Sequence, residues 1–253
     1  MTIRVQLFNT CLGENFYPGV LRDMVAVLER LGVECRMPEG QTCCGQPFYN
    51  SGLQQCARPP ARHWLRVFGG TDGYIVAPSA SCVGFVRRRY EGLFPEGSPE
   101  HTAVQEAAAR TYEFTEFLTR VLQVTEVGAW FPHRVTYHTS CHLLREFGLR
   151  NEPKQLLRGV GGLELVPLTD EETCCGFGGS FSVIFPEVSK QIMEKKIQAI
   201  DNSGAEVVVA AETGCLMNIH GGLHKAQAPV RAMHLIQVLA QEDRGQRQGN
   251  GGR

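Results

Sequence analysis

Short apolar runs alternate with longer amphipathic segments along the first 80 residues. The apolar runs have the length and composition of buried strands, whereas the longer segments repeat apolar positions every three or four residues, which is typical of helices. Strands are predicted over 3–8, 33–37 and 74–77, and helices over 18–31 and 59–68. The order of these segments is βαβαβ.

The second half of the chain repeats this order. Strands are predicted over 135–138, 163–166 and 206–211, and helices over 153–160 and 186–200. Between the halves, a segment containing proline and glycine covers 93–99, and a pair of helices is predicted over 104–124. Each half is therefore expected to form its own unit of strands and helices.

Helices that alternate with short strands connect strands running in parallel, with the helices on the faces of the sheet. The predicted fold class is therefore α/β, with two tandem pseudo-symmetric lobes, each a small parallel β-sheet flanked by helices. We expect the first domain over 1–128, with inter-lobe helices at about 103–124, and the second over 129–242. The remaining residues, 243–253, are rich in Gly, Arg and Gln and are predicted to be a disordered tail.

The cysteines obey a repeat that divides the chain into the same halves. Thr-Cys-Cys-Gly occurs at 42–45 and again at 173–176, and each copy lies between two single cysteines. Corresponding cysteines of the two halves are 130 to 133 residues apart. Eight of the ten cysteines follow this repeat and form the predicted set of metal ligands: Cys11, Cys43, Cys44, Cys82, Cys141, Cys174, Cys175 and Cys215.

Each repeated cysteine comes after a predicted strand. Cys11 follows the first strand, Cys43 and Cys44 follow the second, and Cys82 follows the third. Because the carboxyl ends of parallel strands meet at one edge of a sheet, where α/β proteins bind ligands, these four thiols are expected to converge. The second half predicts the same convergence for its own four cysteines.

Four converging thiolates are a typical ligand set for an iron-sulfur cluster, and soft sulfur ligands select iron-sulfur or zinc over hard cations. Zinc sites usually take two cysteines separated by a short gap, so that both sulfurs reach one ion. Adjacent side chains in extended chain point in opposite directions, and a cluster offers them separate iron atoms. The adjacent cysteines therefore favour an iron-sulfur cluster over zinc.

A glycine follows each adjacent pair of cysteines, at Gly45 and Gly176. A residue free to adopt positive φ lets the backbone turn around the sulfurs and direct amide groups at them. Hydrogen bonds of that kind tune the potential of a cluster. A plain loop glycine is the alternative for Gly45 alone, but its recurrence at Gly176, ahead of Gly178 and Gly179, favours a close approach of the backbone.

Two histidines flank Cys141 in the second half, His138 and His142. The corresponding residues of the first half are Phe8 and Leu12, so the halves do not share a histidine ligand. A hydrogen-bonded packing role is favoured for His138, whereas packing and catalysis are both open for His142. The remaining histidines after Cys215 are predicted to lie at the surface or beside a cluster: His220, His224 and His234.

The composition of the chain argues against some classes of binding partner and indicates the cellular compartment. The net charge is −1 and the chain has no long basic run, so we do not expect it to bind nucleic acid or an anionic membrane. The N-terminus shows no signal-peptide pattern and no apolar run is long enough to span a bilayer, so we expect a cytoplasmic protein without membrane insertion. In a reducing cytosol, ten cysteines indicate metal binding or redox chemistry rather than disulfides.

The other motifs do not add a site. Cys35 and Cys56 have no counterparts in the other half and are predicted to be small buried residues. The glycine-rich segment after Cys175 lacks the third glycine of a dinucleotide fingerprint, and no Walker-type lysine follows it. No cofactor site beyond the cluster ligands, and no catalytic residue, is therefore assigned.

With the repeated Cys-Cys-Gly and its flanking cysteines, the chain resembles the cysteine-rich CCG-domain proteins over nearly its whole length, and most closely the lactate utilization protein A group. The similarity to that group rests on the compact two-domain length, the lack of an appended ferredoxin-type domain, and the segments 81–84 and 214–218. More distant relatives are the iron-sulfur subunit of glycolate oxidase and the heterodisulfide reductase subunit with paired CCG domains, which pass electrons. The fullest family pattern ends each half in Cys-x-x-Cys, where this chain has Phe85 and Asn218, so an ordinary [4Fe-4S] cluster suits it better than a five-cysteine cluster.

The resemblance implies an iron-sulfur electron-transfer subunit of a cytoplasmic complex that oxidises L-lactate to pyruvate, hence part of an oxidoreductase rather than a complete enzyme. It implies one or two [4Fe-4S] clusters held by the eight repeated cysteines. As partners it implies a ferredoxin-type iron-sulfur protein and a third lactate-utilization subunit. Two alternatives stay open: cluster-based disulfide chemistry, as in heterodisulfide reductase, and a structural zinc protein.

Overall fold

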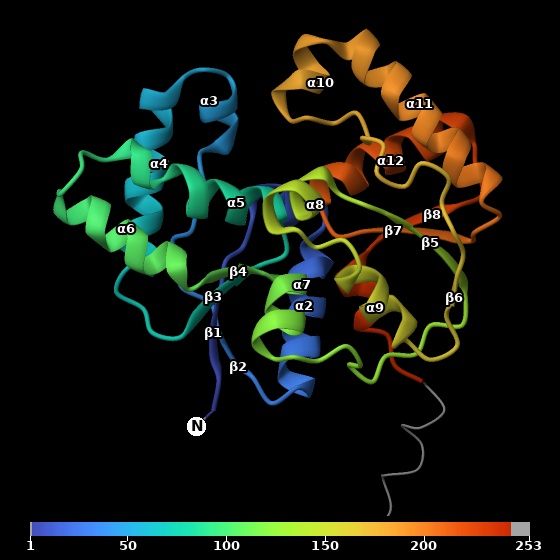
Figure 1. The fold of residues 1–253 in the computed structure, drawn as a ribbon, viewed down its shortest axis with the longest axis horizontal. Coiled ribbons are helices and arrows are strands. Elements are labelled where there is room, and N and C mark those ends of the chain that lie inside the picture. The colour runs from blue at the N-terminus through green and yellow to red at the C-terminus, as the bar shows by residue number, and fades with distance from the viewer. Residues whose placement is uncertain (1, 244–253) are drawn as a thin grey trace, which may run out of the picture.

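Two four-stranded parallel β-sheets, one in each half of the chain, organise the molecule (Figure 1). The computed structural model describes residues 2–243. The strand order is β2-β1-β3-β4 in the first sheet and β6-β5-β7-β8 in the second, so the two sheets have the same topology. All neighbouring strands pair in parallel. The predicted α/β class with two similar lobes is confirmed.

The elements of the first half match the predicted series, with ends that differ by a few residues. They are β1 (Arg4–Leu7), α1 (Cys11–Phe16), α2 (Pro18–Arg30), β2 (Glu34–Arg36), α3 (Gln46–Asn50), α4 (Gln54–Phe68), β3 (Tyr74–Ala77), α5 (Ala80–Arg89), η1 (Glu91–Leu93), α6 (Pro99–Ala109), β4 (Thr111–Glu113), α7 (Phe114–Glu116) and the π-helix η2 (Phe117–Val121). Helix α4 begins five residues earlier than predicted and contains Pro59 and Pro60. Burial of Trp64 and Phe68 on the same helix offsets the lost backbone bonds.

The second half follows the same order. Its elements are β5 (Arg134–His138), α8 (Cys141–Phe147), α9 (Glu152–Arg158), β6 (Glu164–Leu165), α10 (Ser180–Ile184), α11 (Pro186–Asn202), β7 (Val207–Ala210), α12 (Thr213–Ala226), β8 (Arg231–His234) and α13 (Leu235–Leu239). The tail predicted over 243–253 lies outside the described residues, apart from its first one.

The fourth strand of each sheet is not evident from the sequence pattern. Strand β4 pairs with β3, with Thr111 opposite Ile75, and it interrupts the pair of helices predicted over 104–124. Strand β8 pairs with β7, with Arg231 opposite Val207. Both strands are short and carry polar or charged residues, so they lack the apolar alternation that marks a strand. Pairing with a buried neighbour, rather than local propensity, determines their conformation.

Arg30 of α2 links the first half to the C-terminal part of the second. Its guanidinium donates hydrogen bonds to the backbone oxygens of Val127, Leu239 and Ala240 at 3.0 to 3.1 Å. Helix α2 also packs against α13. These contacts make the hydrophobic core continuous between the lobes, since Val27 and Leu239 belong to one cluster of buried side chains.

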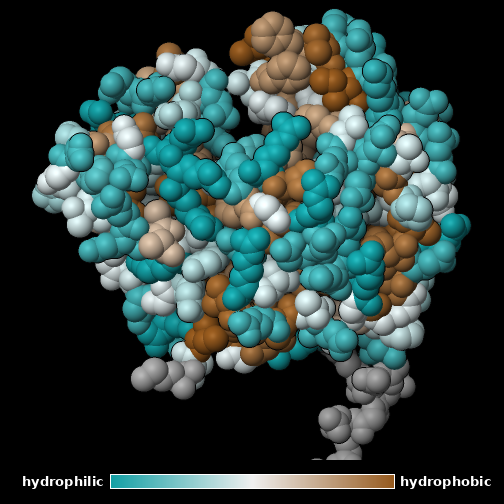
Figure 2. Space-filling view, viewed as in Figure 1, coloured by the Kyte–Doolittle hydropathy of each residue, from teal (hydrophilic) through white to brown (hydrophobic). Residues whose placement is uncertain are grey.

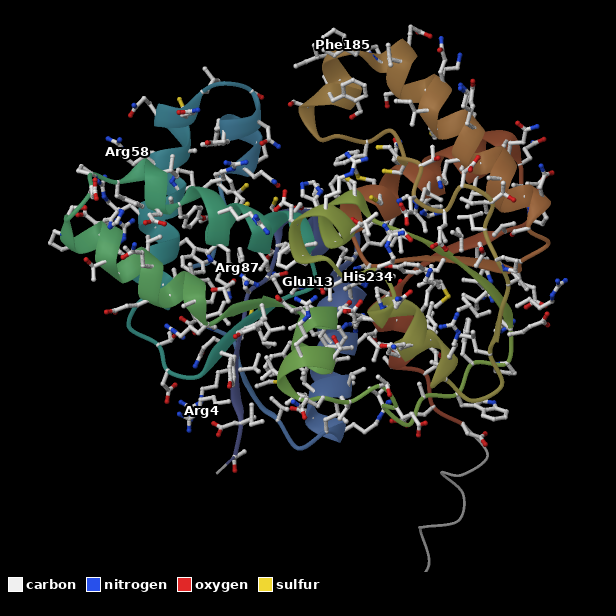
Figure 3. All side chains as sticks on the ribbon, in the orientation of Figure 1. Arg4, Arg58, Arg87, Glu113, Phe185 and His234 are labelled. Atoms are coloured by element: carbon white, nitrogen blue, oxygen red, sulfur yellow. The ribbon has the colours of Figure 1, made fainter. Side chains whose placement is uncertain are left out.

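Two buried titratable residues end the equivalent strands β4 and β8 and cap the helices that follow. The Glu113 carboxylate accepts hydrogen bonds from the amides of Thr115 and Glu116, and His234 Nδ1 accepts one from the amide of Ile236. Both side chains lie in the middle of the molecule (Figure 3). Burial raises the pKa of Glu113 to about 8 and lowers the pKa of His234 to about 4. His234 is completely buried, so a surface position for it is wrong.

An apolar surface covers α10 and the beginning of α11 (Figure 2). Its side chains are Val183, Ile184, Phe185 and Val188, which are between 49% and 80% exposed. Exposed apolar groups that gather in this way mark contacts with other proteins.

Within residues 2–243, no helix combines the length and the apolar character that crossing a bilayer requires.

Candidate metal centres

The four repeated cysteines of the first half come together at the carboxyl edge of its sheet. Cys11 begins α1 after β1, Cys43 and Cys44 lie in the loop between β2 and α3, and Cys82 is in the first turn of α5 after β3. The Sγ atoms of Cys11 and Cys43 are 3.7 Å apart, as are those of Cys44 and Cys82. The expected convergence is therefore present, and it takes the form of two close pairs.

Cys43 contacts Cys11 and Cys44 contacts Cys82, and the adjacent thiols of Cys43 and Cys44 also interact with each other. Two thiolates bound to one tetrahedral metal at about 2.3 Å lie about 3.8 Å apart, close to the observed separation. Each pair can therefore bind one metal atom, as in a zinc or a two-iron centre, whereas a [4Fe-4S] cluster takes one thiolate for each iron and would need the paired thiols to move apart. A donor set of this kind fits a thiolate-bound centre with more than one metal atom.

The second half repeats this arrangement. Cys141 begins α8, Cys174 and Cys175 precede α10, and Cys215 lies in the first turn of α12. The Cys174 thiol is the main cause that raises the pKa of Cys141, and the thiols of Cys174 and Cys215 raise the pKa of Cys175, so these four thiols are close neighbours. Cys175 and Cys215 are buried, whereas Cys174 is exposed. The second group of thiols is therefore gathered at the same positions of its lobe as the first group, after the equivalent strands and at the starts of the equivalent helices.

Gly45 and Gly176 turn the backbone around the sulfurs, as their recurrence predicts. Their φ angles are +91° and +90°, a conformation that side chains other than glycine rarely adopt. The amide of Gly45 donates to Cys43 Sγ at 3.4 Å, and the amide of Gly176 donates to Cys174 Sγ at 3.3 Å. Amides directed at sulfur stabilise the thiolate and therefore favour metal binding.

In each lobe, the first cysteine of the adjacent pair is strongly acidic. A hydrogen bond from the Cys11 thiol is the main cause that lowers the pKa of Cys43 to about 2. The Cys141 thiol lowers the pKa of Cys174 to about 2 in the same way. The amide of the following glycine contributes in both cases. Since the thiolate is the form that binds metal, the hydrogen bonds at these two positions favour the form that a metal needs.

The two cysteines outside the repeat have different surroundings. Cys35 lies on β2 and is partly buried, and burial raises the pKa of its thiol to about 11. Cys56 lies in the first turn of α4 and is exposed, so the buried position predicted for it is wrong. The earlier start of α4 is the reason, because it places Cys56 on the solvent side of a helix rather than in a packed loop.

Glu212 is a buried residue of the site that the sequence does not single out. It lies directly before α12 and reaches the first turn of α5 in the other lobe. Its Oε2 accepts a hydrogen bond from the amide of Ser81 at 2.9 Å, and its Oε1 accepts from the hydroxyls of Ser79 and Ser81 at 3.0 and 3.1 Å. Because Ser81 precedes Cys82, a carboxylate of one lobe positions the cysteine-bearing helix of the other.

Lys196 on α11 places a cation beside the second group of thiols. The side chain is buried, and its ammonium donates to the backbone oxygens of Asp170 and Glu171 at 2.8 and 3.3 Å. Burial lowers the pKa of Lys196, while the neighbouring Cys175 acts to raise it. A buried positive charge at this position offsets the negative charge of thiolates.

The two histidines beside Cys141 differ in their surroundings. His142 Nδ1 lies 3.7 Å from Cys141 Sγ, and its Nε2 lies 3.8 Å from a carboxylate oxygen of Glu146. His138 is 1% exposed, and within the part of the chain that the structure describes neither ring nitrogen has a hydrogen-bond partner. The His138 ring also interacts with the Cys215 thiol and helps to lower its pKa, so the packing role for His138 stays a prediction.

Alanine at Gly176 is expected to destabilise the second centre. A methyl group there would lie 2.6 Å from the backbone oxygen of Ser189, and the φ of +90° would be strained as well. We expect a loss of about 3 kcal/mol in the free energy of unfolding, together with reduced metal content. Thermal unfolding and metal analysis measure the two effects.

Gly179→Ala is the matched control for this substitution. Gly179 also has a positive φ, of +63°, but no described atom lies within 4 Å of the added carbon. Only backbone strain of about 2 kcal/mol is expected, because φ of +63° combined with ψ of −117° disfavours alanine, and metal content should be unchanged. Equal losses in the two variants would show that the close approach at Gly176 is unimportant.

The cysteine-rich CCG domain matches this chain twice, over residues 5–87 and 135–220. The lactate utilization protein A of an Exiguobacterium species is 46% identical over 236 residues, which are 93% of this chain and 96% of that protein. The lactate utilization protein A of Geobacillus thermodenitrificans is 46% identical over 238 residues, which are 94% of this chain and 98% of that protein. The two domain matches together include all eight repeated cysteines.

Among solved structures, a hypothetical protein from Helicobacter pylori aligns with a TM-score of 0.58 and 10% sequence identity, over 99% of this chain and 49% of that one. This likeness concerns the fold alone. The two matched domains and the high identity over nearly the whole length agree with the geometry of the repeated cysteines. The chain belongs to the lactate utilization protein A family of cysteine-rich CCG-domain proteins.

Proposed function

We propose that this protein is an iron-sulfur electron carrier of a lactate-oxidising system. The observation that carries the proposal is the gathering of eight repeated cysteines into two groups of four at the sheet edges, in a chain whose relatives are named for lactate utilization. Thiolate groups of four are the usual ligands of iron-sulfur clusters. We expect one or two clusters of the [4Fe-4S] type.

The surroundings of the thiols suit a metal centre that is oxidised and reduced during electron transfer. A bound cluster would supply the capacity to accept and pass single electrons. The amides of Gly45 and Gly176 direct partial positive charge at sulfur. Burial of Cys44 and Cys175 keeps water away from the inner side of each group. Such hydrogen bonds and low solvent exposure set the potential of a centre of this kind.

Other subunits would supply the substrate chemistry, since lactate oxidation releases two electrons and the sequence shows no flavin or nicotinamide motif. As partners we propose a ferredoxin-type iron-sulfur protein and a third lactate-utilization subunit, in the cytoplasm. Helix α10, which carries part of the apolar surface, begins five residues after Cys175, so a protein bound there would lie near the second group of thiols. The chain would then act as one subunit of an oxidoreductase.

Growth on L-lactate tests the proposed role. Deletion of the gene in its host should abolish growth on L-lactate and leave growth on glucose unchanged. The wild-type gene and a Cys56→Ser variant should both restore growth, whereas Cys43→Ser or Cys174→Ser should not. Normal growth of the deletion strain on L-lactate, in a host without a second lactate-oxidising enzyme, would contradict the lactate assignment.

A structural zinc protein is the second candidate function. The 3.7 Å separation of paired sulfurs also suits two thiolates on a single zinc ion. A zinc protein would be colourless and would not change oxidation state, so it could not carry electrons. Metal analysis therefore separates this candidate from the iron-sulfur carrier.

A further inference from the structure

We propose that His138 is a metal ligand of the second centre, so that the two lobes hold chemically different centres. In this assignment an imidazole nitrogen joins the thiolates of Cys175 and Cys215, whereas the first lobe offers thiolates alone. The inference rests on the proposed presence of a metal centre in the second lobe and adds to it the identity of one ligand.

The position of His138 requires a partner for its ring. The residue ends β5, where its backbone pairs with Ala210 of the adjacent strand, and its side chain is 1% exposed. Neither ring nitrogen has a hydrogen-bond partner among residues 2–243. Burying a polar group without a partner is unfavourable, and most buried polar atoms in proteins therefore have one. A metal ion would satisfy one of the nitrogens.

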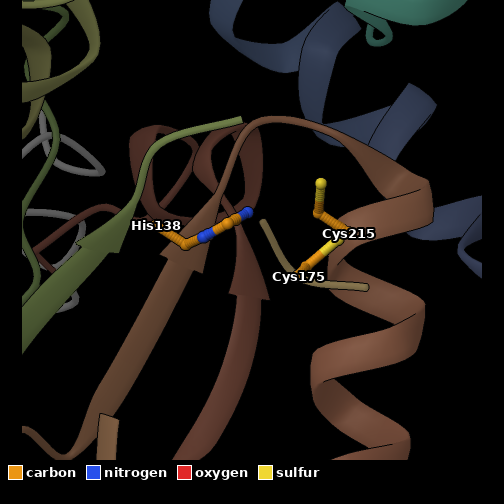
Figure 4. Close-up of side chains that lie close together, drawn as sticks. All are labelled: His138, Cys175 and Cys215. Carbon is orange, nitrogen blue, oxygen red and sulfur yellow. The ribbon is translucent and has the colours of Figure 1, made fainter. Parts of the chain in front are cut away.

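The geometry places that nitrogen beside two thiols. One ligand atom each from His138, Cys175 and Cys215 lies within 4.8 Å of the other two. His138 projects from the end of its strand toward Cys175 and Cys215 (Figure 4). All three side chains are buried. Three convergent nitrogen and sulfur donors, shielded from water, are a ligand set that iron and zinc both accept.

The first lobe has no equivalent donor. The residue that corresponds to His138 is Phe8, whose ring packs against Trp64 and Phe68 with centroids 5.8 and 5.4 Å apart. The same backbone position therefore serves the hydrophobic core in one lobe and faces the thiols in the other. A neutral imidazole adds no negative charge to a centre, unlike a thiolate, so the second centre should have the higher reduction potential.

His142 is the competing nitrogen donor and provides a control. Its Nδ1 lies 3.7 Å from Cys141 Sγ, but its side chain is 31% exposed and its other nitrogen faces Glu146 at 3.8 Å. Water and this carboxylate can satisfy the His142 ring without a metal. His142→Phe should therefore leave the ligand set of the second centre unchanged.

The first test uses the iron-loaded protein. Pulsed electron paramagnetic resonance of the reduced wild type should show hyperfine coupling to a directly bound nitrogen. The coupling should be lost in His138→Phe, which copies the first lobe, and kept in His142→Phe. A coupling that survives in His138→Phe, or that disappears only in His142→Phe, would overturn the assignment. Iron without any nitrogen coupling would also overturn it while leaving the proposed electron carrier intact.

The second test uses Co²⁺ and does not depend on a cluster. In a background with serine at all four repeated cysteines of the first lobe (Cys11, Cys43, Cys44 and Cys82), Co²⁺ titrated into the metal-free protein should give thiolate charge-transfer bands from the second lobe alone. His138→Phe should weaken Co²⁺ binding about 100-fold or more, since even residues that only support a ligand contribute about 10- to 100-fold. Unchanged affinity would overturn the proposal even if the native protein held no iron.

Two further variants guard against misfolding. His138→Leu removes the donor with a smaller side chain than phenylalanine and should weaken Co²⁺ binding to the same extent. His138→Cys supplies a thiol in place of the imidazole and should restore binding with more intense charge-transfer bands. Failure of His138→Cys to bind more tightly than His138→Leu, with both variants folded by circular dichroism, would contradict a ligand role.

Discussion

Serine in place of Cys43 or Cys174 is expected to remove the metal centre of its own lobe and to leave the other lobe loaded. Each of these thiols has a pKa of about 2 because its partner thiol and the following amide donate hydrogen bonds to it. A serine hydroxyl does not ionise at neutral pH and is a harder ligand, so the thiolate is not replaced. If both lobes are loaded in the wild type, iron per chain should fall by about half in each variant, and by nearly all in the double variant.

The matched controls for this prediction are the cysteines outside the repeat. Cys35→Ser and Cys56→Ser should keep the iron content of the wild type, because neither residue belongs to the four-thiol groups. Cys56 is exposed and is the cleaner control, since serine there costs no buried packing. Iron analysis after anaerobic purification compares the wild type with all five variants. Equal iron loss in all the single variants would contradict the assignment of ligands by repeat.

Alanine in place of Glu212 is expected to destabilise the protein. Although Glu212 belongs to the second lobe, the substitution should reduce the metal content of the first lobe. The substitution removes the acceptor of three hydrogen bonds, from the amide of Ser81 and the hydroxyls of Ser79 and Ser81. Buried donors left without an acceptor cost about 3 kcal/mol in total, or a fall of roughly 10 °C in Tm for a chain of this size. The first turn of α5 should then hold Cys82 less firmly.

Glu212→Gln separates loss of the acceptor from loss of the charge. The glutamine oxygen can accept from the Ser81 amide, while its NH2 group donates to the serine hydroxyls, which accept as well as they donate. We therefore expect Glu212→Gln to keep most of the stability and the metal. In a Cys174→Ser background, which reports only on the first lobe, iron analysis of the Glu212→Ala variant tests the effect between lobes. Unchanged iron there would contradict it.

The repeated parts of the site can be predicted from the sequence because each has a local signal. Apolar strands followed directly by cysteine place the eight thiols at the sheet edges, since parallel strand ends always meet there. The recurrence of glycine after each cysteine pair predicts the positive φ of Gly45 and Gly176 and the amides that face sulfur. Periodicity and repetition are sufficient for these features.

The parts that the sequence does not reveal depend on long-range pairing. Strands β4 and β8 adopt their conformation because a neighbouring strand pairs with them. Glu212 accepts its hydrogen bonds only because the fold of the other lobe brings Ser79 and Ser81 close to it. The sequence around Glu212 gives no indication of these two partners.

Two missed residues do carry a signal. Lys196 lies on the same face of its helix as Ile197 and Ile200, so the apolar spacing of α11 marks it as a buried cation. A histidine at the position where the repeat has Phe8 marks His138 as a polar group at a core position. In both cases a polar residue occupies a position that the helical period or the sequence repeat assigns to the hydrophobic core, and this mismatch indicates a special role.

The central claim is that the two groups of thiols hold iron and inorganic sulfide. Iron and acid-labile sulfide should be measured on protein purified without oxygen, together with electron paramagnetic resonance before and after reduction. The account predicts a brown protein that contains both elements in similar amounts and a signal that changes on reduction. Protein that contains zinc or no metal, and no sulfide, from cells that load another iron-sulfur protein normally, would contradict it.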